Sequence, residues 1–423
     1  MLIFAWLGPA AGMPLVDLES LKNSIVNEVH SLERRIVEVS KTIHSSPELG
    51  LKEYKASELL SSELERHGFK VERGIADMPT AFRATLATGR AGPRLVYLAE
   101  YDALPQIGHG CGHNIVGTSA VFSAIALGRI ADRLTGTIMV LGTPDEEGSG
   151  GKIQMVKAGC FEDVDAAMMS HPMNYTSPWQ PSVGVDCLTV EFTGRAAHYS
   201  TPHRGVNALD GAVLMLAGLN FLRHGFRNDV IYGYTIDHGG ISPGIVPEKA
   251  VARLWIKSTD LRNLAHVISK VKACAEGVAE SIGAQVRIEH PFPVFEESIP
   301  NLTLIHAVSQ NLTRLGIRFR PPEESSRSLA YVSTDYGNVS HVVPSVSAVI
   351  AIGPQELTVH TEKFREAAVS KAGHEALLAV TKVMAMTGVD VLCRPGILEA
   401  AKSEFLKYKE SGFADGPFAP VYD

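Results

Sequence analysis

Two clusters of potential metal ligands stand out in this sequence of 423 residues. The first is His109-Gly-Cys-Gly-His113, which brings a thiol and two imidazoles together, and the second is the pair Glu146-Glu147. Thiolate, imidazole and carboxylate groups at neighbouring strand ends are typical of a metal site. A bound divalent ion lowers the pKa of a water, and a nearby carboxylate that is not a ligand can take the proton. The clusters therefore predict a metal-dependent hydrolase.

The elements around these clusters alternate between strands and helices. Buried strands are predicted at 94–99, 137–143 and 166–169, and helices at 117–130 and 153–158. This order favours an α/β fold with a mainly parallel sheet and helices on both faces. In such sheets ligands gather beyond the carboxyl ends of the strands, and a polar cluster follows each of the three strands.

Other stretches extend this catalytic domain on both sides. Apolar residues at three- and four-residue spacing predict an amphipathic helix over 18–43, and Gly68 ends a second helix over 53–67. Near the other end of the chain, a helix over 302–315 and a strand over 348–352 return to the same domain. His171 follows the 166–169 strand, and Pro172 is expected to be a rigid exit from the sheet.

Between these parts the pattern changes to that of a small α+β insertion. Strands are predicted at 185–192 and 250–256, and helices at 208–224 and 263–282. Two domains are therefore predicted: a metal-binding catalytic domain formed by 1–183 and 298–423, and a smaller inserted domain formed by 184–297.

Composition narrows the class of function. The net charge is −7 and no block of Lys and Arg is present, which argues against a nucleic-acid partner and favours a small-molecule substrate. Five scattered cysteines are not a disulfide framework, so a reducing cytoplasm is expected. The apolar start of the chain lacks basic residues and is too short to span a bilayer, so neither a signal peptide nor a membrane segment is predicted. Met13 could equally be the start of translation.

Six motifs, in order along the chain, resemble the M20 metallopeptidase and amidohydrolase family. The resemblance covers about 18–391 and is closest to the aminoacylase-like branch of hippurate hydrolases, p-aminobenzoyl-glutamate hydrolases and M20-domain dipeptidases. It implies a zinc-peptidase-like catalytic domain. The motifs are Pro47-Glu48-Leu49-Gly50, Tyr101-Asp102-Ala103-Leu104-Pro105, Gly110-Cys111-Gly112-His113-Asn114, Asp145-Glu146-Glu147-Gly148, Gly194-Arg195-Ala196-Ala197-His198 and Ser333-Thr334-Asp335-Tyr336-Gly337-Asn338.

The resemblance also implies roles for individual residues. Glu146 becomes the general base, and Asp102 accepts a hydrogen bond from a ligand imidazole. One or two divalent ions are expected; Cys with His favours Zn²⁺, whereas mixed nitrogen and oxygen sites accept Mn²⁺ or Co²⁺. Whether Cys111 bridges two ions is left open. The implied metal ligands are Cys111, His113, Glu147, His171 and His360.

The resemblance implies that the inserted domain 184–297 is a lid and dimerisation domain. It also implies that His198 of this lid reaches over the site and stabilises the oxyanion of the tetrahedral intermediate. A donor of this kind is commonly worth about 3 kcal/mol of barrier. In many members of the family this histidine crosses a dimer interface, so a homodimer or higher homo-oligomer is expected. Because the lid is a separate domain, hinge closure is the expected gating step.

Two lid positions depart from the family pattern and bear on the substrate. Gly244 stands where Asn is usual, and Lys257 stands where Arg is usual. Lys lacks the bidentate fork with which Arg holds a carboxylate, so the carboxylate of the substrate is expected to be absent, placed differently or held by another residue such as Arg204. The candidate substrate-binding residues are therefore Lys257, Gly244 and Arg204.

Three functions remain open from the sequence. Amide cleavage of a small N-acyl, aminobenzoyl or dipeptide-like substrate is the main hypothesis. The first alternative is hydrolytic deamination of an activated aromatic amine such as a substituted aminobenzoate, which has no carbonyl oxyanion to anchor. The second is a catalytically silent binding protein, which should have lost a ligand or the base, and none is missing.

Overall fold

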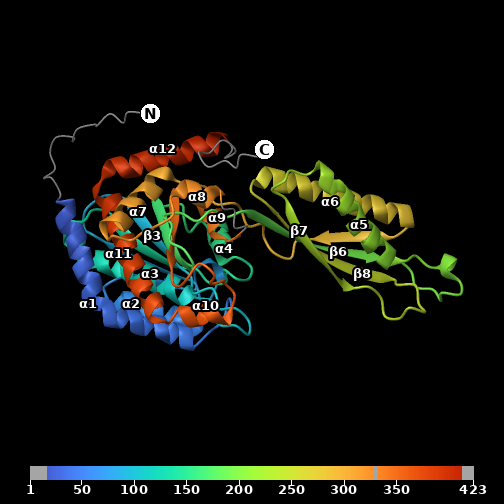
Figure 1. Ribbon diagram of the computed structural model, residues 1–423, viewed down its shortest axis with the longest axis horizontal. Coiled ribbons are helices and arrows are strands. Elements are labelled where there is room, and N and C mark those ends of the chain that lie inside the picture. The colour runs from blue at the N-terminus through green and yellow to red at the C-terminus, as the bar shows by residue number, and fades with distance from the viewer. Residues whose placement is uncertain (1–16, 328–331, 412–423) are drawn as a thin grey trace.

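Two sheets lie side by side in the computed structural model, which describes residues 17–327 and 332–411 (Figure 1). The larger sheet has the strand order β1-β2-β4-β3-β5-β10, and the smaller one has the order β7-β8-β6-β9. Each sheet carries its own helices and its own apolar core. The N-terminal apolar stretch and Met13 lie outside the described residues.

The larger sheet is mainly parallel, which confirms the predicted fold class. β4, β3, β5 and β10 are parallel to one another, whereas β2 runs antiparallel to both β4 and β1. Its strands are β1 (Lys70–Arg73), β2 (Phe82–Ala87), β3 (Arg94–Ala99), β4 (Thr137–Gly142), β5 (Ala166–Met173) and β10 (Ser345–Ala351).

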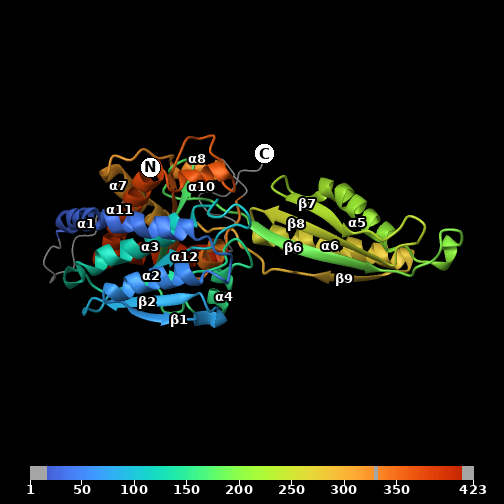
Figure 2. The same cartoon turned by 90° about the horizontal axis from the view of Figure 1, so that it is seen from below.

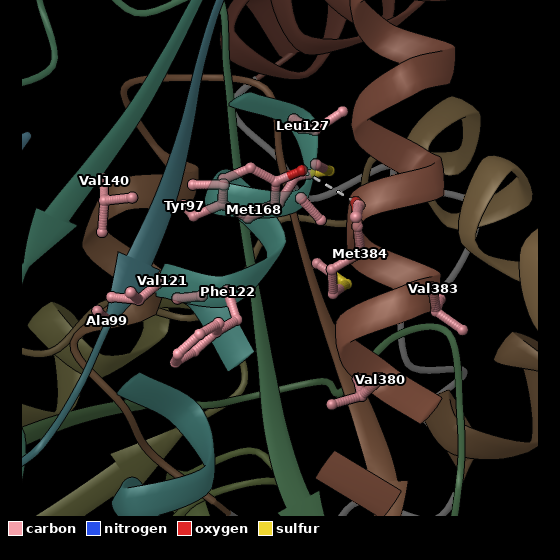
Figure 3. Close-up of a cluster of buried hydrophobic side chains, with 14 of the residues drawn as sticks. Tyr97, Ala99, Val121, Phe122, Leu127, Val140, Met168, Val380, Val383 and Met384 are labelled. Carbon is pink, nitrogen blue, oxygen red and sulfur yellow. Dashed lines mark hydrogen bonds between the residues drawn. The ribbon is translucent and has the colours of Figure 1, made fainter. Parts of the chain in front are cut away.

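Helices cover both faces of this sheet because the residues of β3 alternate between two apolar cores. Tyr97 faces α3 (His113–Gly128) and α11 (Lys371–Cys393), and its hydroxyl donates to the Met384 carbonyl at 3.0 Å (Figure 3). α1 (Leu18–Ser45) packs against both of these helices. Val96 and Leu98 point the other way, into a core shared with α4 (Gly151–Lys157) and α9 (Tyr336–Ser340). α11 is long and apolar enough to cross a bilayer, but 78% of its most apolar stretch is buried in this core.

The remaining helices of the catalytic domain pack around this framework. They are α2 (Tyr54–Arg66), α7 (Leu302–Arg314), α8 (Pro322–Arg327), α10 (Glu362–Ala367), α12 (Pro395–Ser411) and the short 3₁₀ turns η1 (Ile75–Asp77) and η2 (Ala131–Arg133).

β5 is longer than predicted, and the expectation that Pro172 is the exit from the sheet is wrong. The strand continues to Met173, and Pro172 lies opposite Ile350 of β10. On its other side, β5 is paired with β3 only at Ala166–Met168. Proline cannot donate a hydrogen bond, and it is tolerated here because β5 has one unpaired edge at this point. His171 therefore lies within the strand.

The smaller sheet forms an elongated lid that extends away from the catalytic domain (Figures 1 and 2). All of its strands and helices fall within the predicted lid segment 184–297. Both α-helices pack on the face that carries Leu188, Val190 and Phe192, so the opposite face of the sheet is open. The lid elements are β6 (Gly184–Thr193), η3 (Pro202–Arg204), α5 (Ala208–Leu222), η4 (Arg223–Gly225), β7 (Ile231–His238), β8 (Lys249–Ser258), α6 (Leu261–Ile282) and β9 (Gln285–Glu289).

Two neighbouring stretches of chain connect the lid to the catalytic domain. In the first, the Val183 N–H donates to the Val332 carbonyl at 2.8 Å. The second returns beside it, because Val185 and Phe295 exchange backbone hydrogen bonds of 2.9 and 3.1 Å. Any movement of the lid relative to the catalytic domain must pass through these two stretches, which we call the lid crossings.

Candidate metal centre and active site

Glycines shape the loop that presents Cys111 at the carboxyl edge of the larger sheet. Gly112 has φ +81°, a left-handed conformation that glycine adopts without strain, and α3 begins at the next residue. A Cβ atom at Gly112 would lie 2.5 Å from Pro172, and one at Gly110 would lie 2.6 Å from Ile107. The loop can therefore pack tightly while the side chains of Cys111 and His113 point to the same region.

Asp102 holds two of the predicted ligands at once. One carboxylate oxygen accepts from His113 Nδ1 at 2.8 Å, and the other accepts from the Glu147 N–H at 2.9 Å. Because the proton sits on Nδ1, Nε2 of His113 keeps its lone pair. Asp102 thus lies where it can orient both His113 and Glu147.

The predicted ligands form two groups that share Cys111. In each group, the potential ligand atoms lie within 4.8 Å of one another. The first group is Cys111, His113 and His171, with 3.5 Å between Cys111 Sγ and His171 Nε2. The second is Cys111, Glu147 and His360, with 3.4 Å between His360 Nε2 and Glu147 Oε1. The structure thus brings together all five residues.

Local backbone geometry explains how the two outer histidines reach the group. His171 Nδ1 donates to the Pro172 carbonyl at 2.8 Å, which turns Nε2 toward Cys111. His360 has φ +62°, an uncommon conformation for a residue with a side chain, and its N–H donates to the Gly110 carbonyl at 2.9 Å. Strained backbone of this kind is often found at functional sites.

These atoms suit a divalent metal ion. Ligands about 2.1 Å from a tetrahedral ion lie about 3.4 Å from one another, close to the two distances above. Nε2 of His113 is buried without a hydrogen-bond partner, which is costly unless a ligand satisfies it. The thiol and imidazoles of this mixed donor set favour Zn²⁺, and its nitrogen and oxygen donors also accept Mn²⁺ or Co²⁺.

The pKa values of His171 and Glu147 favour the protonation states in which these residues bind a cation. Burial lowers the pKa of His171 to about 4, so its imidazole is neutral at pH 7. Burial opposes ionisation of Glu147, but the hydrogen bond from His360 outweighs burial and lowers the pKa of Glu147 to about 2. Glu147 is therefore an anion and His171 a neutral donor, the forms in which they bind metal.

Glu146 lies beside the ligand groups without belonging to the two that share Cys111. Its Oε2 is 3.9 Å from His113 Nε2. Burial, and then the charges of Glu100 and Glu147, raise the pKa of Glu146 well above its usual value. A carboxylate with a raised pKa is suited to holding a proton between two steps of a reaction.

Three buried charged residues next to Glu146 were not identified from the sequence as part of the site. Lys152 Nζ lies 2.6 Å from Glu100 Oε1 and 2.6 Å from Asp335 Oδ1, and all three side chains are almost fully buried. Glu100 precedes the Tyr101-Asp102 motif and Asp335 belongs to another of the six motifs, so their positions were a possible signal. A buried lysine gives no such signal.

The structure separates the lid residues that were predicted to act on the substrate. His198, Arg204 and Gly244 lie at the far end of the lid, beyond the last residue of β6. β6 has ten residues, so this end is on the order of 30 Å from the crossings. His198 is exposed, and its Nδ1 contacts the Ser200 hydroxyl at 2.8 Å. Within one chain, His198 does not reach the metal ligands.

Lys257 lies at the opposite, near end of the lid. It pairs with Val185 in β8, and its Nζ lies 4.1 Å from the ring centre of Trp255. Burial lowers the pKa of Lys257 to about 8. Lys257 is therefore the predicted substrate-binding residue that lies closest along the lid to the catalytic domain.

A cavity of about 230 Å³ joins the catalytic residues to the open face of the lid. Glu146 and Glu147 line one side of it. The lid side is largely aromatic, and these aromatic positions were not singled out from the sequence. The lid residues and their neighbours in the wall are Val185, Cys187, Trp255, Phe292, Pro293 and Phe295.

Comparison with known families identifies the class of protein that carries this site. Residues 97–382 match the model of peptidase family M20/M25/M40. The chain belongs to peptidase family M20/M25/M40. It is therefore a metal-dependent hydrolase that acts on carbon–nitrogen bonds, and the predicted resemblance is confirmed.

Relatives within family M20 align over nearly the whole chain. The chain is 35% identical to the Xaa-Arg dipeptidase of Mus musculus, over 92% of this chain and 93% of that one. It is 28% identical to one of the subunits of the p-aminobenzoyl-glutamate hydrolase of Escherichia coli (strain K12), over 92% and 95%. A dinuclear metal-binding M20 peptidase of Bacillus subtilis shares the fold, with a TM-score of 0.67, 18% identity and coverage of 86% and 100%.

Proposed function

We propose that this M20 enzyme hydrolyses an amide bond of a small N-acyl, aminobenzoyl or dipeptide-like substrate, with Glu146 as general base. The observation that carries the proposal is the pair of ligand groups sharing Cys111, with Glu146 directly beside them. The similarity to a dipeptidase and to an aminobenzoyl-glutamate hydrolase supports this substrate class. A catalytically silent binding protein would not need the complete set of metal ligands and the base Glu146.

The catalytic tasks fall to different residues of the site. Cys111, His113, His171, Glu147 and His360 would hold one or two ions, which when bound lower the pKa of a water and polarise the scissile carbonyl. Glu146 takes a proton from the attacking water and returns it to the leaving amine. Asp102 keeps His113 and Glu147 in place.

Lys257 and the aromatic wall suggest how the substrate is oriented. We propose that the ammonium group of Lys257 attracts a carboxylate of the substrate, while Trp255 and Phe292 pack against its apolar part. Lys binds a carboxylate as a single point charge, so the carboxylate is held less rigidly than it would be by Arg.

A second candidate function has its own support. Three aromatic side chains line the lid side of the cavity. Gly244, which like His198 would reach a site only in a partner subunit, offers no amide side chain to anchor a carbonyl oxygen. Both features suit hydrolytic deamination of a substituted aminobenzoate, in which hydroxide adds to a ring carbon and ammonia leaves. The two candidates differ in the product that is released.

One experiment separates these functions. Purified protein is loaded with Zn²⁺, Mn²⁺ or Co²⁺ and incubated with N-acyl amino acids, dipeptides, p-aminobenzoyl-glutamate and substituted aminobenzoates. We expect release of an amino acid or aromatic amine, and a loss of about 10²–10⁴-fold in kcat for Glu146→Gln with metal content unchanged. Release of ammonia alone would select ring deamination, and full activity of Glu146→Gln would refute the assigned base.

We further propose that the enzyme is a homodimer joined through its lids, with His198 supplied to the partner's site. β7 is an edge strand, and unpaired strand edges readily pair with another chain. It exposes apolar side chains, as does the neighbouring helix α5. These residues are Ile231, Tyr234 and Ile236 on β7, and Val213, Leu214 and Phe221 on α5. Ile236→Lys should shift the mass measured by sedimentation toward that of one chain and lower activity, and an unchanged mass with full activity would contradict the dimer.

The cellular location is also a proposal. The five cysteines are free and lie in different parts of the fold. This supports a cytoplasmic enzyme, and fractionation of cells that express the tagged protein tests it.

A further inference from the structure

Residues 332–338 contact both lid crossings, and we call this segment the hinge brace. The Val332 carbonyl accepts from the Val183 N–H at 2.8 Å, and the Ser333 hydroxyl donates to the Val183 carbonyl at 3.0 Å. These two bonds fix the first crossing to the brace.

The other end of the hinge brace holds the second crossing. The Asn338 side chain accepts from the Glu296 N–H and donates to the Val294 carbonyl, both at 3.2 Å. Gly337 packs so closely that a Cβ atom there would lie 1.8 Å from the Glu296 carbonyl oxygen. The brace therefore cannot move independently of either crossing.

Asp335 lies at the centre of the hinge brace, and both of its carboxylate oxygens accept hydrogen bonds from Lys152 of the catalytic domain. One accepts from Lys152 Nζ at 2.6 Å, and the other accepts from the Lys152 backbone N–H at 2.9 Å. Lys152 is in the first turn of α4, directly after the loop that carries Glu146 and Glu147. This loop, residues 143–150, is the catalytic loop.

The interaction between Asp335 and Lys152 is rigid because it is buried and consists of two hydrogen bonds. Asp335 and Lys152 have no exposed side-chain surface, and Lys152 Nζ also contacts Glu100 at the end of β3. Separating such charges would leave one of them buried and unpaired, which is strongly unfavourable. A displacement of the hinge brace must therefore carry the end of the catalytic loop with it.

We propose that Lys152 and Asp335 are positioning residues that couple the lid crossings to the catalytic loop. When the lid moves, the hinge brace transmits the movement through Asp335 to Lys152 and so to Glu146 and Glu147. In the reverse direction, ordering of the catalytic loop by metal at Glu147 restrains the crossings. This role goes beyond the proposed hydrolysis, because it concerns how the lid and the site influence each other.

The test compares two buried lysine–aspartate pairs of the same domain. Lys152→Gln/Asp335→Asn replaces the coupling pair by neutral amides and removes one charge of each sign. Lys22→Gln/Asp390→Asn makes the same exchange at a pair 2.7 Å apart between α1 and α11, where neither residue contacts a lid crossing. Amide hydrogen exchange is measured at residues 183–185 and 294–296 with and without Zn²⁺, so no substrate is needed.

In the wild type and in the α1–α11 variant, we expect Zn²⁺ to slow exchange at both crossings several-fold. In Lys152→Gln/Asp335→Asn we expect bound Zn²⁺, confirmed by metal analysis, without that slowing, and a lower kcat with little change in KM. Asn338→Ala leaves the ion pairs intact and should lose the effect at 294–296 while keeping it at 183–185. No zinc-dependent change in the wild type, or equal slowing in all variants, would overturn the proposal.

Discussion

Asp102→Asn tests whether one carboxylate aligns two metal ligands. In the wild type, its two oxygens accept from His113 Nδ1 at 2.8 Å and from the Glu147 N–H at 2.9 Å. Asparagine has only one acceptor oxygen, so its NH₂ group must face one of these two donors. The variant loses a hydrogen bond to a charged acceptor, which contributes about 1.5–3 kcal/mol.

The expected loss of metal affinity follows from this geometry. Changing the partner of a ligand typically lowers metal affinity about 10–100-fold. At about 1.4 kcal/mol for each factor of ten, this corresponds to about 1.4–2.8 kcal/mol, which agrees with the hydrogen-bond figure. We therefore expect Zn²⁺ to bind Asp102→Asn about 10–100-fold more weakly, measured by competition with a chromophoric chelator at constant pH.

Asp229→Asn is the matched control for this measurement. Asp229 is also buried and accepts from the Ser258 hydroxyl at 2.7 Å and the Thr259 N–H at 3.0 Å, and both partners belong to the lid. Its replacement should lower thermal stability and leave zinc affinity unchanged. The reasoning is refuted if Asp102→Asn binds zinc within about threefold of the wild type, or if both variants lose affinity equally.

Three further predictions test other parts of the molecule. Phe122→Ala removes a fully buried ring of α3 (Figure 3) and should cost about 3–5 kcal/mol in denaturant unfolding; a cost below about 1 kcal/mol would contradict its place in the core. His360→Ala should reduce bound zinc by one ion per chain, whereas Cys111→Ala should weaken the binding of both ions. The same zinc content per chain in the two variants, measured by metal analysis, would argue against a shared thiolate. Because the pKa of Lys257 is about 8, its positive charge is present below that pH and lost above it. KM for an anionic substrate should therefore rise tenfold per pH unit well above pH 8. In Lys257→Arg, KM should stay constant up to pH 10.

Local sequence patterns predicted much of the fold because periodicity and burial agree there. The helix over 18–43 is observed at Leu18–Ser45, and the strand over 94–99 coincides with β3. The helix predicted from 117 begins at His113 instead, because Gly112 in its left-handed conformation ends the loop earlier. β7 was not located, since most of its residues are exposed and no apolar alternation marks it.

Some site residues could likewise be predicted from local motifs, whereas others depend on residues far away in the sequence. Cys111, His113 and Glu147 stand in recognisable motifs, and the resemblance supplied His171 and His360. Lys152 could not be found, because its meaning depends on Asp335, which lies 183 residues further along the chain. The distance of His198 from the ligands was equally hidden, since it depends on the length and direction of β6.

The insertion of the lid also sets the order in which the chain can fold during synthesis. The lid sheet is contiguous and is complete once β9 has been made, whereas β5 must wait for β10, and α1 must wait for α11. Contacts between such distant segments form slowly. We expect the nascent chain to contain a folded lid and an incompletely folded catalytic domain, in which four of the five predicted metal ligands are present before His360 has been synthesised. Apolar faces of α1 and α3 stay uncovered during that interval, so yield in the cell should depend on chaperones and on the rate of translation through α11.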